Sequence, residues 1–111
     1  MLIEKIGTAA MLEQTAEECA ELAQACLKVA RKIRNENPTP KTMEEVKDNF
    51  TEELADVLIC LDELTIGGYL DGEGLKKWTD YKRNRITERL GGCYGEKKPR
   101  EQTRPTEEAE K

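Results

Sequence analysis

Apolar residues recur at helical spacing along an uninterrupted stretch, residues 8–34, that contains neither Gly nor Pro. The stretch is rich in Ala, Leu, Glu, Gln and Lys, which are strong helix formers. A first apolar series steps by 4-3-4-3-4-3 through Leu12, Ala16, Cys19, Ala23, Cys26, Ala30 and Ile33. A second series runs beside it through Met11, Thr15, Glu18, Leu22, Ala25 and Val29. The pattern predicts one long amphipathic helix.

A second helix is predicted after a segment that interrupts the pattern. Residues 35–41 contain two prolines and two asparagines, which end a helix and favour a turn. Thr42 followed by Glu45 is a capping-box pattern and predicts a helix start, and the pair Gly67-Gly68 predicts its end near Ile66. The apolar series of this helix is Val46, Phe50, Glu53, Val57, Cys60 and Leu64.

A third, shorter amphipathic helix is predicted from about Gly74 to Leu90, and the composition then changes. Residues 96–111 include ten charged side chains, five of each sign, and two prolines. Such a segment buries too little apolar surface to offset the entropy of ordering. We therefore predict an all-α fold, a helical bundle of two long helices plus a shorter third in residues 1–92, followed by a polar, disordered tail in residues 93–111. No segment has a strand pattern.

The composition restricts the chemistry and the partners. The absence of His and Ser excludes Ser-His-Asp and Cys-His catalysis and imidazole metal sites. A formal net charge of −5 argues against nucleic-acid binding, which requires a basic surface. No apolar run is long enough to span a membrane, and residues 1–7 do not resemble a signal peptide. We expect a cytoplasmic protein with no membrane partner.

The four cysteines are expected to be structural. They show no Cys-x-x-Cys spacing, which argues against a zinc site or a disulfide framework. Cys19, Cys26 and Cys60 fall within apolar helical series, where a reduced thiol acts as a small hydrophobic side chain. The fourth, Cys93, follows the last predicted helix.

Carboxylates at Glu-x-x-Glu/Asp spacing are the strongest chemical signal, although the motif alone is weak in so acidic a chain. It occurs four times, at Glu18/Glu21, Glu45/Asp48, Glu53/Asp56 and Glu107/Glu110. Glu18 and Glu53 each occupy a position where an apolar series of a long helix calls for an apolar side chain. Glu21 and Asp56 lie at the margins of the same series.

The pairs Glu18/Glu21 and Glu53/Asp56, which lie on or beside the apolar series of the two long helices, predict a metal site. Burying unpaired carboxylates costs several kcal/mol each, and the helices offer too few inward-pointing bases to neutralise them. A divalent cation would do so, and all-oxygen ligation favours Mg²⁺, with Mn²⁺ as an alternative, over zinc. The competing interpretation is that each Glu is a solvated or ion-paired surface residue. In each of the two long helices, a Glu interrupts the apolar series at a matching position. This coincidence favours the metal site.

These residues resemble a known family. The runs Glu17-Glu18-Cys19-Ala20-Glu21-Leu22 and Glu52-Glu53-Leu54-Ala55-Asp56-Val57-Leu58-Ile59 are similar to the paired signature of MazG-like all-α nucleoside triphosphate pyrophosphohydrolases, which also include dimeric dUTPases. The run from Lys82 to Leu90 resembles the basic closing helix of that family. The match covers about residues 8–90.

The resemblance implies a function and a set of site residues. It implies Mg²⁺ held by Glu18, Glu21, Glu53 and Asp56, and hydrolysis of an NTP or dNTP to the NMP and pyrophosphate. In the absence of His, a carboxylate is the expected general base, and the sequence does not distinguish Glu18 from Glu53 as this catalytic residue.

The third predicted helix supplies candidates for substrate contacts. Lys82, Arg85 and Arg89 share one side and suit the β- and γ-phosphates, although a solvated, ion-paired face explains them equally well. Trp78 and Tyr81 are candidates for a base or ribose contact. The alternative for Trp78 is that it anchors the core of this helix.

The apolar series exceed what three helices of one chain can cover, so we expect a homodimer or a tetramer. The rival function is a non-catalytic helical oligomerisation or interaction module. A carboxylate-bridged di-iron bundle is disfavoured, because that site type requires Glu-x-x-His.

Overall fold

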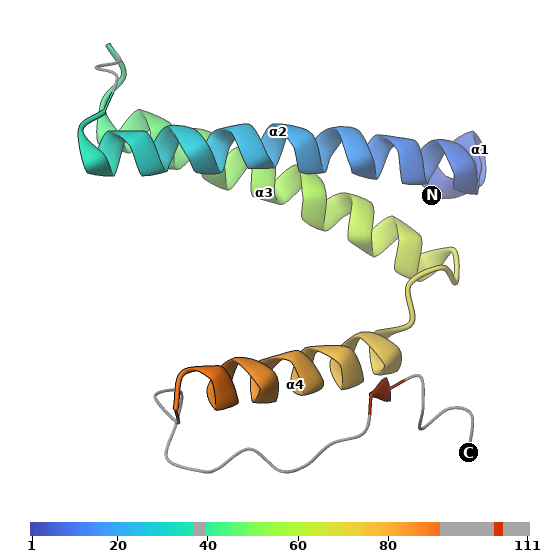
Figure 1. Ribbon diagram of the computed structural model, residues 1–111. Helices are drawn as coiled ribbons and strands as arrows, with labels where there is room; N and C mark the ends of the chain where they lie inside the picture. Colours follow the sequence, from blue (N-terminus) through green and yellow to red (C-terminus); the bar gives the residue numbers. More distant parts are fainter. Residues whose placement is uncertain (37–39, 92–103, 106–111) are drawn as a thin grey trace. The chain divides into compact units, whose positions relative to one another are not determined.

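The computed structural model describes residues 1–36, 40–91 and 104–105. These residues form four helices and no strand: α1 (Leu2–Ile6), α2 (Thr8–Arg34), α3 (Met43–Ile66) and α4 (Gly72–Arg89) (Figure 1). The all-α prediction and the three predicted helices are confirmed. The predicted tail, residues 93–111, lies outside the described residues except for positions 104 and 105.

The chain divides into two compact units, Met1–Leu70 and Asp71–Lys111. The first contains α1, α2 and α3, and the second contains α4. Each unit is described by itself below. That residues 1–92 act as one functional domain stays a prediction.

Helices α2 and α3 form an antiparallel hairpin whose ends agree with the sequence signals (Figure 1). Asn35 ends α2 in the left-handed conformation, with φ of 58°. At the start of α3, the Glu45 backbone N–H donates a 3.1 Å hydrogen bond to Thr42 Oγ1, and the Thr42 N–H donates a 3.2 Å bond to Glu45 Oε1. The predicted capping box is therefore present, and it satisfies two backbone donors that a helix start leaves without partners.

The core of the first unit lies between one face of α2 and one face of α3. Met11 and Ala25 of the second series of α2 are buried, and so are Val46, Val57, Cys60 and Leu64 of the predicted α3 series. The remaining members of those two series are half-buried. The α3 series and the second series of α2 are thus the helix faces in contact.

The first series of α2 is not part of this core. Six of its seven members are exposed and Ala30 is half-buried. An unbroken apolar pattern of this kind is typical of a buried helix face. The reason is geometric, since the first and second series are about 90° apart around the helix and α3 covers only one of them. Leu12 and Ile33 remain 45% and 69% exposed.

Helix α1 is an element that the sequence pattern did not predict. Its five residues are too few to show a helical period, but Ile3 joins Met11, Cys60 and Leu64 in the core. The Leu2 backbone N–H donates a 2.7 Å hydrogen bond to Glu63 Oε1, which ties α1 to α3. Gly7 links α1 to α2 with φ of 88°, a conformation that favours glycine.

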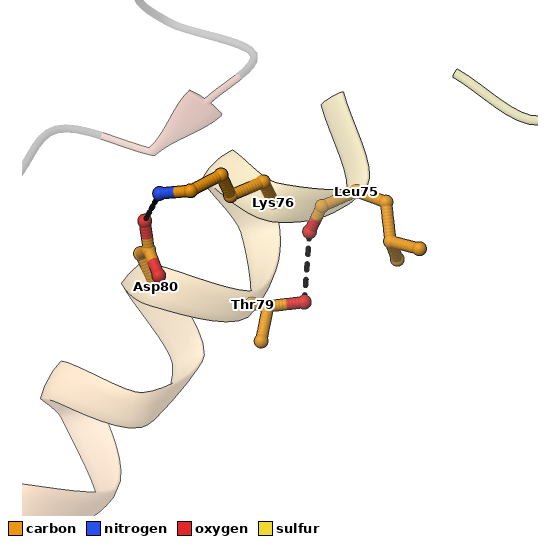
Figure 2. A network of polar contacts seen from close by, with 4 residues as sticks. All are labelled: Leu75, Lys76, Thr79 and Asp80. Carbon is orange, nitrogen blue, oxygen red and sulfur yellow. Dashed lines mark hydrogen bonds and ion pairs between the residues drawn. The ribbon is translucent and has the colours of Figure 1, made fainter. Parts of the chain in front are cut away.

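Helix α4 begins two residues earlier than the predicted Gly74. The Glu73 backbone N–H donates a 3.1 Å hydrogen bond to Asp71 Oδ1, so Asp71 is the N-cap. On the exposed side of the first turns, Lys76 forms a 3.1 Å ion pair with Asp80, and Thr79 Oγ1 donates to the Leu75 carbonyl (Figure 2). An exposed i,i+4 pair of this kind contributes only about 0.3–0.5 kcal/mol.

Membrane insertion of a helix finds no support in the described residues. None of the helices in these ranges combines the length and the apolar character that crossing a membrane requires.

Candidate metal centre

Four carboxylates from α2 and α3 converge on one point of the hairpin. One carboxylate oxygen from each of Glu18, Glu21, Glu53 and Asp56 lies within 4.8 Å of those of the other three. Each helix contributes two residues three positions apart, which places both on the same side of that helix. The structure therefore brings together all four predicted metal ligands, and the antiparallel arrangement of α2 and α3 is what makes them meet.

Two oxygen atoms in this cluster are buried without a hydrogen-bond partner. Glu18 Oε1 accepts a 2.8 Å hydrogen bond from the Gln14 side-chain amide, whereas Glu18 Oε2 and Glu53 Oε2 are buried and unpaired. The ion pairs of Met1 with Glu4 and of Lys76 with Asp80 lie elsewhere, and within residues 1–36 and 40–91 no ion pair reaches the cluster. Negative charge is thus concentrated where protein groups do not neutralise it.

The close carboxylates alter the acidity of Glu18. The Gln14 amide lowers the pKa of Glu18, but partial burial and the negative charges of Glu21 and Asp56 together outweigh that effect. The pKa is therefore raised above the ordinary value of 4.5. Glu18 therefore takes up a proton more readily than an ordinary glutamate does.

The acidity of Glu21 changes in the same direction. Its carboxyl group shares a hydrogen bond with the Glu53 carboxyl and faces that residue's charge, and both effects raise the pKa of Glu21 above 4.5. Partial desolvation adds to them. A cation bound at the cluster would oppose this shift, because its positive charge favours the ionised form of Glu21.

The donor set matches the requirements of a hard divalent cation. Carboxylate oxygens are the ligands that Mg²⁺ and Mn²⁺ prefer, and the unpaired oxygens of Glu18 and Glu53 have no competing protein donor. Glu18, Glu53 and Asp56 are half-buried and Glu21 is exposed, so the cluster has both a partly desolvated side and an open side. These residues could hold a metal ion.

The other two occurrences of the carboxylate motif do not form such a site in the described residues. Glu45 and Asp48 are exposed, and Glu45 is engaged in the capping box. Glu107 and Glu110 lie outside the described residues.

The predicted substrate-contact residues of α4 form a separate group within the second unit. The Lys82 ammonium lies 5.8 Å from the centroid of the Trp78 ring, and the Arg85 guanidinium lies 5.9 Å from that of Tyr81. The two rings pack edge to face at 5.9 Å. Arg89 is exposed. Two basic side chains of this helix are therefore in contact with its two aromatic rings. The roles of these residues toward a nucleotide stay predictions.

The alternative interpretation of Trp78 as a core anchor has little support in the described residues. Trp78 is half-buried, but Leu75 and Ile86, the neighbours expected to share that core, are 51% and 44% exposed. The Arg104 guanidinium lies 5.4 Å from the centroid of the Trp78 ring.

The three described cysteines are free thiols, and one of them lies in the core as predicted, whereas the packing role of the other two stays a prediction. Cys60 is buried in the α2–α3 core, and burial raises the pKa of its thiol above the ordinary 9.0. Cys19 and Cys26 are exposed free thiols, because they belong to the α2 series that α3 does not cover. Cys93 lies outside the described residues.

Sequence reasoning missed two polar residues that act around the hairpin. Gln14, one turn before Glu18, supplies the amide that holds the Glu18 carboxylate. Glu63 binds the start of α1 through Oε1, and its buried Oε2 has no partner. The spacing of four between Gln14 and Glu18 was a usable signal, whereas nothing in the sequence indicated the contact of Glu63 with α1.

Comparisons of the chain with protein-family models, with curated proteins and with solved structures gave no match.

Proposed function

We propose that this protein is a Mg²⁺-dependent nucleoside triphosphate pyrophosphohydrolase that converts an NTP or dNTP to the NMP and pyrophosphate. The observation that carries the proposal is the four-carboxylate cluster, in which buried oxygens of Glu18 and Glu53 lack partners. The resemblance of the two Glu-x-x-Glu/Asp runs to MazG-like enzymes supplies the reaction class.

The carboxylates account for the need for a cation in handling a triphosphate. An anionic substrate would be repelled from four acidic side chains that have no basic partner in the described hairpin. When bound, Mg²⁺ supplies charge neutralisation, polarises the phosphate and lowers the pKa of coordinated water. Glu18, Glu21, Glu53 and Asp56 would hold it, and Mn²⁺ would fit the same oxygen set.

One carboxylate of the cluster serves as general base in this proposal. Hydrolysis at the α-phosphorus requires a group that removes a proton from the attacking water, and the chain contains no His. Glu18 and Glu53 are the two candidates, because each has one oxygen free of hydrogen bonds. Gln14 positions Glu18 through its other oxygen.

Helix α4 supplies the remaining contacts of the proposal. Lys82, Arg85 and Arg89 are assigned to the phosphates, and Trp78 and Tyr81 to the base or ribose. Cation–π contacts hold the basic side chains of Lys82 and Arg85 next to the two aromatic rings. Self-association as a homodimer or tetramer is also part of the proposal, and it is supported by the exposed apolar series of α2.

The test is a screen of the common NTPs and dNTPs for pyrophosphate release in Mg²⁺. We expect release from at least one substrate, and a loss of about 100-fold or more in kcat/KM for Glu53→Gln. The matched control is Glu52→Gln, which removes the adjacent, exposed carboxylate and should retain activity. Absence of release from every nucleotide, or equal activity of Glu53→Gln and wild type, contradicts the proposal.

The rival function is a non-catalytic interaction module, favoured by the large exposed apolar side chains of α2. The two are separated by the thermal melting of the protein with and without Mg²⁺. A metal site predicts stabilisation that disappears in Glu18→Gln, through preferential binding of the cation to the folded state. An interaction module predicts no response to Mg²⁺.

A further inference from the structure

The ring of Trp78 in α4 is in contact with two cations of its own unit. The Arg104 guanidinium lies over the ring, 5.4 Å from its centroid, and the Lys82 ammonium lies 5.8 Å from the same point. Both distances fall within the range of about 6 Å over which an aromatic ring attracts a cation. The ring that the proposed function assigns to a base or ribose is therefore already engaged by side chains of the protein.

The two cations reach Trp78 in different ways. Lys82 follows Trp78 by four positions on α4, so the helix itself places the two side chains next to each other. Arg104 lies beyond Arg89, the last residue of α4, and no helical spacing relates it to Trp78. Arg104 is also exposed. Its guanidinium can therefore leave the ring without any change in α4.

An arginine side chain and a nucleobase use an aromatic ring in the same way. The guanidinium group is planar, delocalised and weakly hydrated, and it stacks on aromatic faces. A nucleobase is planar as well, and it stacks on the face of a tryptophan. Because both need the face of the ring, a base that stacks where Arg104 lies has to displace it.

We propose that Arg104 is an internal competitor for Trp78, which lies over the ring in the absence of ligand and is displaced when a nucleobase stacks there. The inference rests on the proposed function, which supplies the nucleobase as the ligand of Trp78. Arg104 thereby lowers the affinity of every ligand that stacks on this ring, the NMP product included, and favours release of that product.

The magnitudes of the two contacts permit this exchange. An exposed cation–π contact shifts an equilibrium by about two- to fivefold. Stacking of a base on an aromatic side chain shifts it by about five- to hundredfold. The base therefore displaces Arg104, and the contact that is lost reduces the apparent affinity by about two- to fivefold.

A different role of Arg104 makes the opposite prediction. If its guanidinium bound the phosphates of the nucleotide, the contact would add to the affinity. Removal of Arg104 would then weaken nucleotide binding, whereas removal of a competitor strengthens it. The sign of the change in affinity separates the two roles.

The first measurement is acrylamide quenching of Trp78 fluorescence in the free, full-length protein. Trp78 is the only tryptophan of the chain, so the emission reports on this ring alone. Acrylamide is neutral and has to touch the ring, so loss of the guanidinium should increase the quenching constant in Arg104→Ala. Arg83→Ala, which removes an exposed arginine of α4, is the matched control and should be quenched as wild type is.

The second measurement is the binding of AMP, GMP, CMP, UMP and dTMP in Mg²⁺, followed by the emission of Trp78. At least one of them should bind Arg104→Ala about two- to fivefold more tightly than wild type. Arg104→Lys keeps a cation but loses the planar guanidinium, so its affinity should lie between the two. Circular dichroism establishes that each variant remains helical.

Three results would overturn the proposal: equal acrylamide quenching of wild type and Arg104→Ala, unchanged or weaker nucleotide binding by Arg104→Ala, and absence of binding for all five monophosphates. Failure of the proposed function is a separate result. It is the absence of pyrophosphate release from every NTP and dNTP, whatever the quenching of Trp78.

Discussion

The Gln14 side-chain amide donates a 2.8 Å hydrogen bond to Glu18 Oε1, and this bond leaves the buried Oε2 of the same carboxylate without a partner. One oxygen of Glu18 is therefore fixed by the protein, and the other is available to a ligand. The amide also lowers the pKa of Glu18, against the larger combined effect of burial and neighbouring charge.

Removal of this amide should weaken cation binding. In Gln14→Ala the Glu18 carboxylate loses its orienting partner and its pKa rises further, so protons compete more effectively with the metal. We expect a loss of about tenfold in Mg²⁺ affinity, the lower end of what an outer hydrogen bond contributes at a metal site. Titration calorimetry measures the affinity, with Gln24→Ala, which removes an exposed glutamine of the same helix, as control. An unchanged affinity in Gln14→Ala would show that the hydrogen bond has no role in binding.

The stability of the metal-free protein should fall as the pH rises above 4.5. Because the folded-state pKa values of Glu18 and Glu21 are raised, the folded state binds more protons there than the unfolded state. That contribution is complete below the unfolded value near 4.5 and is lost as the pH rises through the folded values. Urea unfolding in EDTA from pH 4.5 to 8 measures it.

The variant Glu21→Gln isolates this contribution from other titrating groups. Its unfolding midpoint should decline less with rising pH than that of wild type, and at pH 8 it should exceed that of wild type, because one repelling charge is gone. Glu52→Gln, exposed on α3, should follow wild type. A Glu21→Gln profile that parallels wild type would mean that the close carboxylates do not repel each other in solution.

The two apolar series of α2 should differ in their contribution to stability. Met11 is fully buried against Ile3, Cys60 and Leu64, so Met11→Ala should lower the free energy of unfolding by about 2–5 kcal/mol. Leu12, in the adjacent series, is 45% exposed. At protein concentrations low enough to keep the chain monomeric, Leu12→Ala should change the free energy of unfolding by less than about 0.5 kcal/mol. Equal effects of the two substitutions would contradict the assignment of the core.

The helices themselves could be predicted from local signals. An uninterrupted run of helix formers indicated α2, and Thr42 with Glu45 located the start of α3 to the residue. Helix α1 could not be predicted, because five residues do not define a period and its stability depends on contacts of Ile3 and Leu2 with distant residues. The start of α4 was placed late, since glycines at positions 72 and 74 obscured Asp71 as the cap.

The carboxylate cluster was predictable because Glu18 and Glu53 occupy core positions of their helices. Which α2 series faces α3 was not predictable, because the two series differ by only about 90° and the one with the more regular apolar pattern is the exposed one. The pattern measures how apolar a face is, and it does not distinguish contact with α3 from contact with another chain. The exposure of Cys19 and Cys26 follows from the same ambiguity.

The central claim is that the four carboxylates bind a divalent cation, and Mn²⁺ titration monitored by electron paramagnetic resonance tests it most directly. The signal of free Mn²⁺ should decrease on addition of wild-type protein and recover on addition of excess Mg²⁺. Glu18→Gln and Glu53→Gln should each bind Mn²⁺ at least about tenfold more weakly, whereas Glu52→Gln should bind as wild type does. Equal Mn²⁺ binding by wild type, Glu18→Gln and Glu53→Gln would contradict the account.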